Sequence, residues 1–467
     1  MFSKYLDSKH DICKQLVDRL SNKYEYVSLL GKQIVGNNVR VMSSNTSIND
    51  SMESQCGFVV KIYDGKAYSE YSFSDIDENS INDIEKAVVE TVRVLDDDSL
   101  VHVSAKALED ESLTKQFSRP MESEPYSIPE IIEKFNAYKG YVHQKNDKVV
   151  QAIFLYEQYE VSSMFISRNR DLKQNFSWCL GVDVIVVKRD NKIQSARGTV
   201  ACNDPRKCVD GLKDKLDDTI KLAEDLLDST IIEPGVYDII TNPSITGLIA
   251  HEAFGHGVEM DMFLKKRARA RKYINKPVAS KLVNMHDGAG ATYSCASYFF
   301  DDEGTLAQDT LIIKNGILQT GICDAVSAAQ LGCKATGNGR RESANRKAYT
   351  RMTNTFFEPG TDKLEDMIKS VKHGYMLFDT NNGMEDPKNW NIQCTAEYGR
   401  EIKDGKFTGK IVSPVVMSGY VPDLLMSISM ISDDFEVIGA GYCGKGHKEW
   451  VTVSDGGPCL KARCKLG

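Results

Sequence analysis

The stretch around which this chain is organised reads His251-Glu252-Ala253-Phe254-Gly255-His256-Gly257-Val258-Glu259. Neutral imidazole is a common zinc ligand, and a carboxylate beside a bound water can accept its proton. The two histidines are five residues apart, which is about 140° of rotation on a straight helix. Side chains so separated cannot easily share one metal, so we expect a locally widened helix such as a π-bulge. Gly255 would ease that distortion, because its backbone is permissive.

The residues before this stretch predict a support for the two histidines. Residues 236–240 read as a short strand, Asn242 offers a side-chain cap, and Pro243 suits the first position of a helix. A strand that feeds a helix is a rigid platform of the kind a metal site needs. Two histidines on a helix that binds no metal are the alternative interpretation, and the pattern alone leaves both open.

A third ligand for such a site has to come from elsewhere in the chain. The candidates are Glu259, His286, His373, Cys443 and His447. Cys443 is the most suggestive, because flanking glycines allow close approach of the backbone and nearby Lys445 would favour the thiolate. Glu259 fits three roles: a third ligand, a partner for the other ring nitrogen of a histidine, or a solvated carboxylate. We favour the second role.

Length and composition limit the class of protein. A chain of 467 residues exceeds the usual size of one core, so we expect two domains, residues 1–232 and 233–467, divided at Glu233-Pro234-Gly235. A net charge of -8 argues against a general nucleic-acid role. The sequence has no apolar run of the roughly 20 residues that span a bilayer and no signal-peptide core at its start. We therefore expect a cytoplasmic protein without membrane contact, whose 12 cysteines are reduced thiols.

The periodicity of residues 1–232 predicts helices near 5–20, 81–95, 129–144 and 206–228, in two units of similar outline. Extended runs lie between them, with a hairpin at Asp64-Gly65, while residues 95–126 are polar and read as a loop or linker. Helices beside an antiparallel sheet make an α+β fold. We expect this half to shape a groove or bind a partner. The second half reads as strand-rich, with a hairpin at Asn315-Gly316.

Two further segments are basic. The run Lys265 to Lys272 is either a solvated helical face or mobile loop, or a surface that attracts acidic groups on a substrate. Thr336 to Arg341 is rich in glycine and lacks the ending of a phosphate loop. This second segment could bind a carboxylate or turn the chain, and we favour the turn.

Several segments together resemble the TldD branch of the TldD/PmbA metallopeptidases. They are His251 to Glu259, Thr336 to Arg341, Arg351 to Thr355, and Cys443-Gly444-Lys445, in order through residues 231–467. The resemblance implies that His251, His256 and Cys443 bind Zn²⁺ and that Glu252 is the catalytic carboxylate. It further implies cleavage of unfolded peptides by a two-domain subunit, in a heterodimer with a TldE (PmbA) subunit or in a homodimer.

The sequence departs from the family pattern in the basic run and at His447, where a glutamine is common. Glu259, Arg351, Asn354 and His447 are predicted to support the ligands or to contact substrate. The leading interpretation is a zinc metallopeptidase in which Glu252 activates water. The alternatives are a non-catalytic peptide-binding subunit with a structural metal, and a redox enzyme with another metal.

Overall fold

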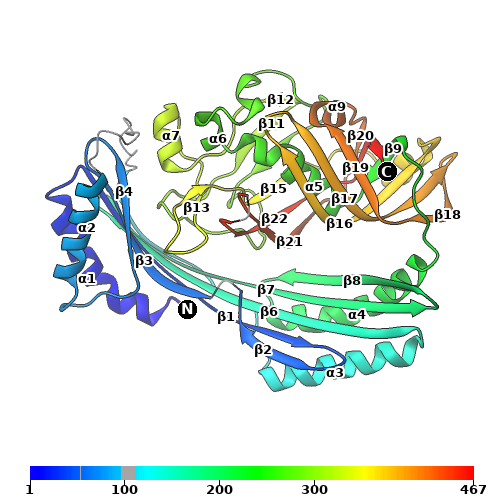
Figure 1. Ribbon diagram of the computed structural model, residues 1–467, viewed down its shortest axis with the longest axis horizontal. Coiled ribbons are helices and arrows are strands. Elements are labelled where there is room, and N and C mark those ends of the chain that lie inside the picture. The colour runs from blue at the N-terminus through cyan, green and yellow to red at the C-terminus, as the bar shows by residue number, and fades with distance from the viewer. Residues whose placement is uncertain (53, 96–110, 447) are drawn as a thin grey trace.

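The computed structural model describes residues 1–52, 54–95, 111–446 and 448–467. Helices and sheets occur in both halves of the chain, which confirms the predicted α+β class. In Figure 1 the N-terminal half is a long curved sheet, and the C-terminal half lies along one face of it. None of the helices in these ranges combines the length and apolar character needed to cross a bilayer.

The two N-terminal units that we predicted share one sheet. Strands β1 and β6 pair antiparallel from Ser28 opposite Ser167 to Val41 opposite Phe154. The strand order is β4-β3-β1-β6-β7-β5, with β2 beside β1 and β8 beside β7. The strands are β1 (Tyr26–Val41), β2 (Thr46–Asp50), β3 (Gln55–Tyr63), β4 (Tyr68–Phe73), β5 (Leu113–Arg119), β6 (Val149–Ser167), β7 (Arg170–Arg189) and β8 (Lys192–Cys202).

The prediction of a loop for residues 95–126 is wrong for β5, which pairs parallel with β7. Residues 96–110 lie outside the described ranges. The side chains of β5 are mostly polar and exposed, so this edge strand carries no apolar pattern that reading the sequence could detect. The hairpin predicted at Asp64-Gly65 is confirmed by the antiparallel pairing of β3 with β4.

Amphipathic helices cover the N-terminal sheet. Their bounds are α1 (Lys4–Ser21), α2 (Ile81–Leu95), α3 (Ile128–Lys145) and α4 (Pro205–Leu226). Helices α1 and α2 pack on β1 and β3, while α3 and α4 pack on β6, β7 and β8. Figure 1 shows α3 and α4 on the face turned away from the C-terminal half. The opposite face of the sheet is therefore available to the rest of the chain.

The C-terminal half contains a closed barrel and a second sheet. In the barrel, β9 joins β16 and β23, and β17 closes the ring by pairing with both β16 and β19. The barrel strands are β9 (Gly235–Thr241), β16 (His373–Asp386), β17 (Asn391–Lys403), β19 (Val415–Tyr420) and β23 (Leu460–Leu466). Two further strands are attached to it, β18 (Lys406–Val412) beside β17 and β20 (Met430–Ile431) beside β23. The order of the second sheet is β12-β11-β10-β15-β22-β21.

The second sheet confirms the hairpin predicted at Asn315-Gly316, which joins β11 to β12. Its strands are β10 (Met285–Asp287), β11 (Thr310–Lys314), β12 (Ile317–Leu318), β15 (Asn354–Phe357), β21 (Glu436–Cys443) and β22 (Val451–Gly457). A separate two-stranded sheet consists of β13 (Gly339–Arg340) and β14 (Tyr349–Thr350). The helices are α5 (Pro243–Leu248), η1 (Ile249–Gly255), η2 (His256–Val258), α6 (Asp261–Leu264), η3 (Arg269–Lys272), α7 (Ala325–Leu331), α8 (Leu364–Lys369) and α9 (Val421–Met426). Helices α5 and η1 pack between barrel strand β16 and strands β15 and β22.

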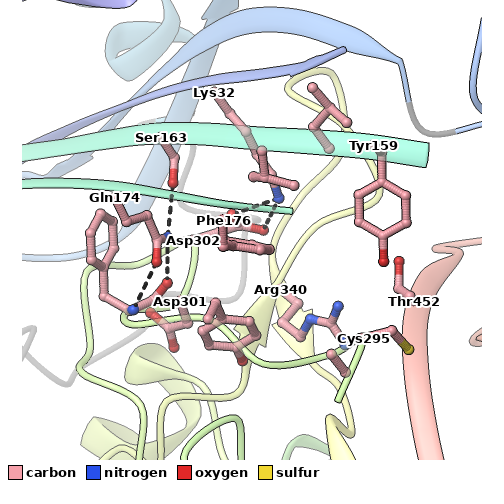
Figure 2. Close-up of a pocket in the computed structure, with 15 residues that line it drawn as sticks. Lys32, Tyr159, Ser163, Gln174, Phe176, Cys295, Asp301, Asp302, Arg340 and Thr452 are labelled. Carbon is pink, nitrogen blue, oxygen red and sulfur yellow. Dashed lines mark hydrogen bonds and ion pairs between the residues drawn. The ribbon is translucent and has the colours of Figure 1, made fainter. Parts of the chain in front are cut away.

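Buried polar and charged contacts join the two halves of the chain. Lys61 pairs with Glu303 and Glu70, and Lys32 pairs with Asp302 at 3.0 Å. Trp178 donates its indole N–H to the carbonyl of Gly439 at 2.9 Å. Beside these contacts lies a cavity of about 50 Å³. Figure 2 shows Lys32 reaching it from β1 and Arg340 from β13. The N-terminal sheet thus contacts β21, the strand that ends at Cys443.

Candidate metal centre

The chain between β9 and Glu259 changes its helical geometry twice. Asn242 caps α5 by accepting the N–H of Ile245 at 3.0 Å, as predicted. The helix then widens into the π-helix η1 and tightens into the 3₁₀ turn η2. The widened turn predicted from the histidine spacing is confirmed, because η1 holds His251 and ends just before His256.

Gly255 has a different role from the one that we predicted. Its φ of -58° is ordinary for a helix, so the freedom of a glycine backbone is not used here. A Cβ added to it would instead lie 2.3 Å from Sδ of Met352. Glycine therefore fits here because the side chain of Met352, between β14 and β15, packs closely against the helix, not because the π-turn needs unusual dihedral angles.

The structure brings His251, His256 and Cys443 together. One ligand atom from each lies within 4.8 Å of the others. The two imidazole rings are 5.1 Å apart and nearly perpendicular, at 87°. Sγ of Cys443 is 3.3 Å from Nε2 of His256. His251 and Cys443 are buried, and the side chain of His256 is 17% exposed, so the cluster opens to solvent on one side.

Cys443 is held as a thiolate by its surroundings. Burial raises the pKa of its thiol, but His256 and His251 outweigh burial and lower that pKa well below its ordinary value. Arg351 also donates from Nη2 to the sulfur at 2.9 Å. The sulfur is consequently in the form that binds metals. Nζ of Lys445, which we predicted to favour the thiolate from nearby, is bound to Asp261 and the carbonyl of Thr350 rather than to the sulfur.

Glu252 lies across the face of the two histidines. Its carboxylate oxygens are 3.9 Å from Nε2 of His251 and 3.8 Å from Nε2 of His256. Burial raises the pKa of Glu252, although both imidazoles act in the opposite direction. A carboxylate with a raised pKa at this distance can accept a proton from a water beside the cluster.

Glu259 lies behind His256. Its Oε2 is 3.3 Å from Nδ1 of His256 and 3.3 Å from Nζ of Lys445. Arg351 Nε is 3.4 Å from Oε1, an ion pair without hydrogen-bond alignment. Burial raises the pKa of Glu259, but Lys445, His256 and Arg351 outweigh it and lower that pKa. An ionised carboxylate here orients the His256 ring.

The remaining predicted candidates do not join the cluster in the described part of the chain. Asn354 uses its amide to hold the carbonyls of Gly288 and Thr292, at 3.0 and 3.1 Å. His286 pairs with Asp309 and Glu358, and His373 pairs with Glu401. His447 lies outside the described residues.

Two acidic residues near the cluster were missed by the sequence analysis. Asp455 of β22 is half-buried near His251, and burial raises its pKa to about 6 although His251 acts against this. Glu385 of β16 is packed toward Gly257, and burial raises its pKa well above the ordinary value. The signal that the sequence offered for these two residues was an acidic side chain within a strand. The strand pairings that bring them here are too distant in sequence to predict.

The residues present fit a zinc ion. Two imidazoles and one thiolate are donors that zinc prefers, and three protein ligands leave a position open for water or substrate. Nδ1 of His251 is buried and makes no hydrogen bond to the described residues. The cluster also has a carboxylate, Glu252, on its open side.

Comparisons with known proteins relate the C-terminal half of this chain to metallopeptidases. Residues 234–462 match the model of the PmbA/TldA metallopeptidase C-terminal domain. A metalloprotease of Methanocaldococcus jannaschii is 34% identical over 227 residues, which are 49% of each chain. The chain thus spans about half the length of that relative. A zinc metalloprotease TldD homolog of Saccharolobus solfataricus is 24% identical over 92% of this chain and 94% of its own.

A solved structure extends the similarity of fold to the whole chain. TldE from Thermococcus kodakarensis superposes with a TM-score of 0.75 at 16% identity, and the match covers 97% of this chain and 99% of that one. The fold of both halves therefore recurs in that protein, whatever its chemistry. Both histidines and Cys443 lie in the stretch that matches the family model, so the resemblance to the TldD/PmbA metallopeptidases is confirmed for residues 234–462.

Proposed function

We propose that this chain is a zinc-dependent peptidase that hydrolyses peptide bonds in unfolded or extended polypeptides. The observation that carries the proposal is the convergence of His251, His256 and Cys443 within 4.8 Å, with Glu252 beside them. These three side chains would hold the zinc ion, which supplies Lewis acidity and a more acidic water. The name of the Saccharolobus solfataricus relative supports the choice of metal.

In this proposal Glu252 is the general base. Its raised pKa makes it a better proton acceptor near neutral pH than an ordinary glutamate. Glu259 would fix His256 in one orientation through Nδ1, and Arg351 would hold the sulfur of Cys443 in place. Asn354 would act only through the backbone around Gly288.

The burial of the site supports an extended substrate. His251 and Cys443 are 2% and 6% exposed, so a compact folded domain could not place its backbone against them. We also propose the two-domain division at residues 232 and 233, with the N-terminal sheet shaping the approach to the centre. We further propose that the chain pairs with a TldE-type subunit, or forms a homodimer where no such subunit is present. We also propose a cytoplasmic location.

The partner proposal is supported by the fold shared with TldE. Sedimentation of the purified protein tests it, because a fully active monomer of 52.1 kDa would contradict both kinds of dimer.

The central experiment replaces Glu252 with glutamine. Glu252→Gln keeps the shape of the side chain but removes its ability to accept a proton. We expect bound zinc and peptide affinity to be retained, while turnover of an unfolded peptide falls by about 10²-fold or more. The matched control is Glu365→Gln, on the first turn of α8, which should leave turnover unchanged. Metal content is measured by mass spectrometry, and activity before and after chelation.

Turnover at the wild-type rate in zinc-loaded Glu252→Gln protein would remove Glu252 from the chemistry. Chelator-resistant cleavage would contradict a zinc peptidase altogether. Peptide binding without any cleavage by the wild type would favour the non-catalytic binding subunit.

A further inference from the structure

The segment that follows the metal-binding helix is strongly basic. Residues 262–286 contain eight lysines and arginines and no aspartate or glutamate, in a chain whose net charge is -8. We call residues 265–276 the basic strip. Its cations are Lys265, Lys266, Arg267, Arg269, Arg271, Lys272 and Lys276. From the sequence alone, this segment is either a solvated helical face or mobile loop, or a surface for acidic groups.

The basic strip is anchored to the fold. Ala268 and Ala270 are 7% and 0% exposed, so alternate side chains point inward while the arginines between and beside them remain exposed. The N–H of Arg269 donates to the carbonyl of Pro387 at 2.8 Å. Lys266 has a φ of 56°, a region that a lysine adopts only when its surroundings impose it. The cations are therefore presented from a fixed backbone.

An ionic chain connects the basic strip to the candidate metal centre. The carboxylate of Asp261 is shared by Lys445, at 2.7 Å, and Lys265, at 3.1 Å. Lys445 also pairs with Glu259, which contacts His256. Three successive ion pairs thus link Lys265, the first residue of the strip, to the carboxylate behind His256.

An aromatic chain makes a second connection. The ring of Trp390 lies 5.9 Å from that of Phe254, which is between the two histidines in sequence. The guanidinium of Arg269 lies 5.9 Å from the centre of the Trp390 ring and 5.5 Å from that of Tyr420. Two independent sets of contacts therefore place the strip beside the same centre.

Most of the positive charge on the strip is not neutralised within the chain. Lys266, Arg267 and Lys272 are exposed, and in the ranges that the structure describes Asp261 is the one carboxylate that pairs with a side chain of the strip. Fixed charges of one sign beside a site raise the local concentration of oppositely charged ligands. Their field extends over about 8 Å at physiological ionic strength.

We propose that the basic strip selects substrate: it binds an acidic segment of an extended polypeptide whose neighbouring peptide bond lies at the metal centre. This inference rests on the proposed peptidase function and adds a substrate class to it. A polypeptide rich in aspartate and glutamate is favoured over a nucleic acid. A long polyanion would also meet the negative remainder of the chain, whereas a short acidic segment needs only the strip.

The experiment neutralises three exposed cations whose side chains make no hydrogen bond or ion pair within the described residues. The variant carries Lys266→Gln, Arg267→Gln and Lys272→Gln. The matched control carries Lys4→Gln, Lys86→Gln and Lys213→Gln, which are exposed residues on α1, α2 and α4. Both sets are made in zinc-loaded Glu252→Gln protein, so that binding is measured without turnover, by fluorescence anisotropy.

Two labelled peptides of equal length are compared, one with a block of glutamates and one with glutamines in their place. We expect the strip variant to bind the acidic peptide at least about tenfold more weakly, at the low end of electrostatic effects of this kind. The neutral peptide should change by less than about twofold, as should both peptides in the control. The difference should shrink as salt is added.

Equal affinity of the strip variant and the control for the acidic peptide would overturn the inference, as would an equal loss for both peptides. A single-stranded oligonucleotide of the same charge that binds more tightly than the acidic peptide would also overturn it, in favour of a nucleic-acid partner. A preference for the acidic peptide in a wild-type protein that cleaves neither peptide supports the strip, while it contradicts the proposed peptidase function.

Discussion

Glu70 is a position where removal of one buried charge has a predictable effect on stability. It belongs to the ionic contacts that join the N-terminal sheet to the C-terminal half. Its carboxylate is 3.3 Å from Nζ of Lys61 and accepts two hydrogen bonds of 3.2 Å from Arg341. Burial raises the pKa of Glu70, but Lys61 and Arg341 outweigh burial and lower that pKa from 4.5 to about 2.

The size of the effect follows from that pKa. At 1.36 kcal/mol for each pKa unit, the change corresponds to about 3 kcal/mol of folding free energy. The pKa is lower in the folded state than in the unfolded state. The contribution is therefore fully present above pH 4.5 and is lost as the pH falls toward 2. Glu70→Gln should lower the free energy of unfolding by about 3 kcal/mol at pH 7 and flatten its decline in acid.

Urea unfolding at a series of pH values between 3 and 7 measures both effects, with midpoints and slopes compared between variants. The matched control is Glu78→Gln, an exposed glutamate without a recorded ion pair in the described residues, which should follow the wild type. The reasoning is refuted if Glu70→Gln and Glu78→Gln unfold with the same free energy at pH 7 and decline equally in acid.

Two further predictions concern the metal centre. Cys443→Ser should weaken zinc binding sharply, because thiolate is a strong zinc ligand; competition with a chromogenic chelator measures this, and unchanged affinity would remove Cys443 from the site. Gly255→Ala should cost about 1–3 kcal/mol through overpacking and reduce zinc retention, because its Cβ would lie 2.3 Å from Met352 Sδ. Gly140→Ala, whose Cβ meets nothing within 4 Å, is the control. Equal thermal stability of these two variants would contradict the steric argument.

Local features of the structure were predictable because their causes are close together in sequence. The π-turn follows from the rotation between His251 and His256, which no straight helix can reconcile with one metal. The cap at Asn242 and the hairpins at Asp64-Gly65 and Asn315-Gly316 follow from the conformational preferences of single residues. Each needs only a few neighbouring side chains.

Features that depend on distant pairing were not predictable. The mostly polar strand β5 gains its place from β7, nearly sixty residues later, and Leu113 and Phe117 are its only apolar residues. Asp455 and Glu385 come to the centre only because β22 and β16 pack against α5 and η1. Periodicity in one segment contains no information about which other segment will cover it.

The position of Lys445 has an electrostatic reason. In a low-dielectric interior each charge needs a counter-charge, and removal of one partner leaves the other buried and unpaired. Around the centre the charges alternate: Arg351 lies between Cys443 and Glu259, and Lys445 lies between Glu259 and Asp261. If Lys445 turned to the sulfur, Asp261 would lose its shorter ion pair, and Glu259 would lose one cation and keep Arg351 and His256. Proximity in sequence favoured Lys445 for the thiolate, but the balance of all the buried charges assigns that contact to Arg351.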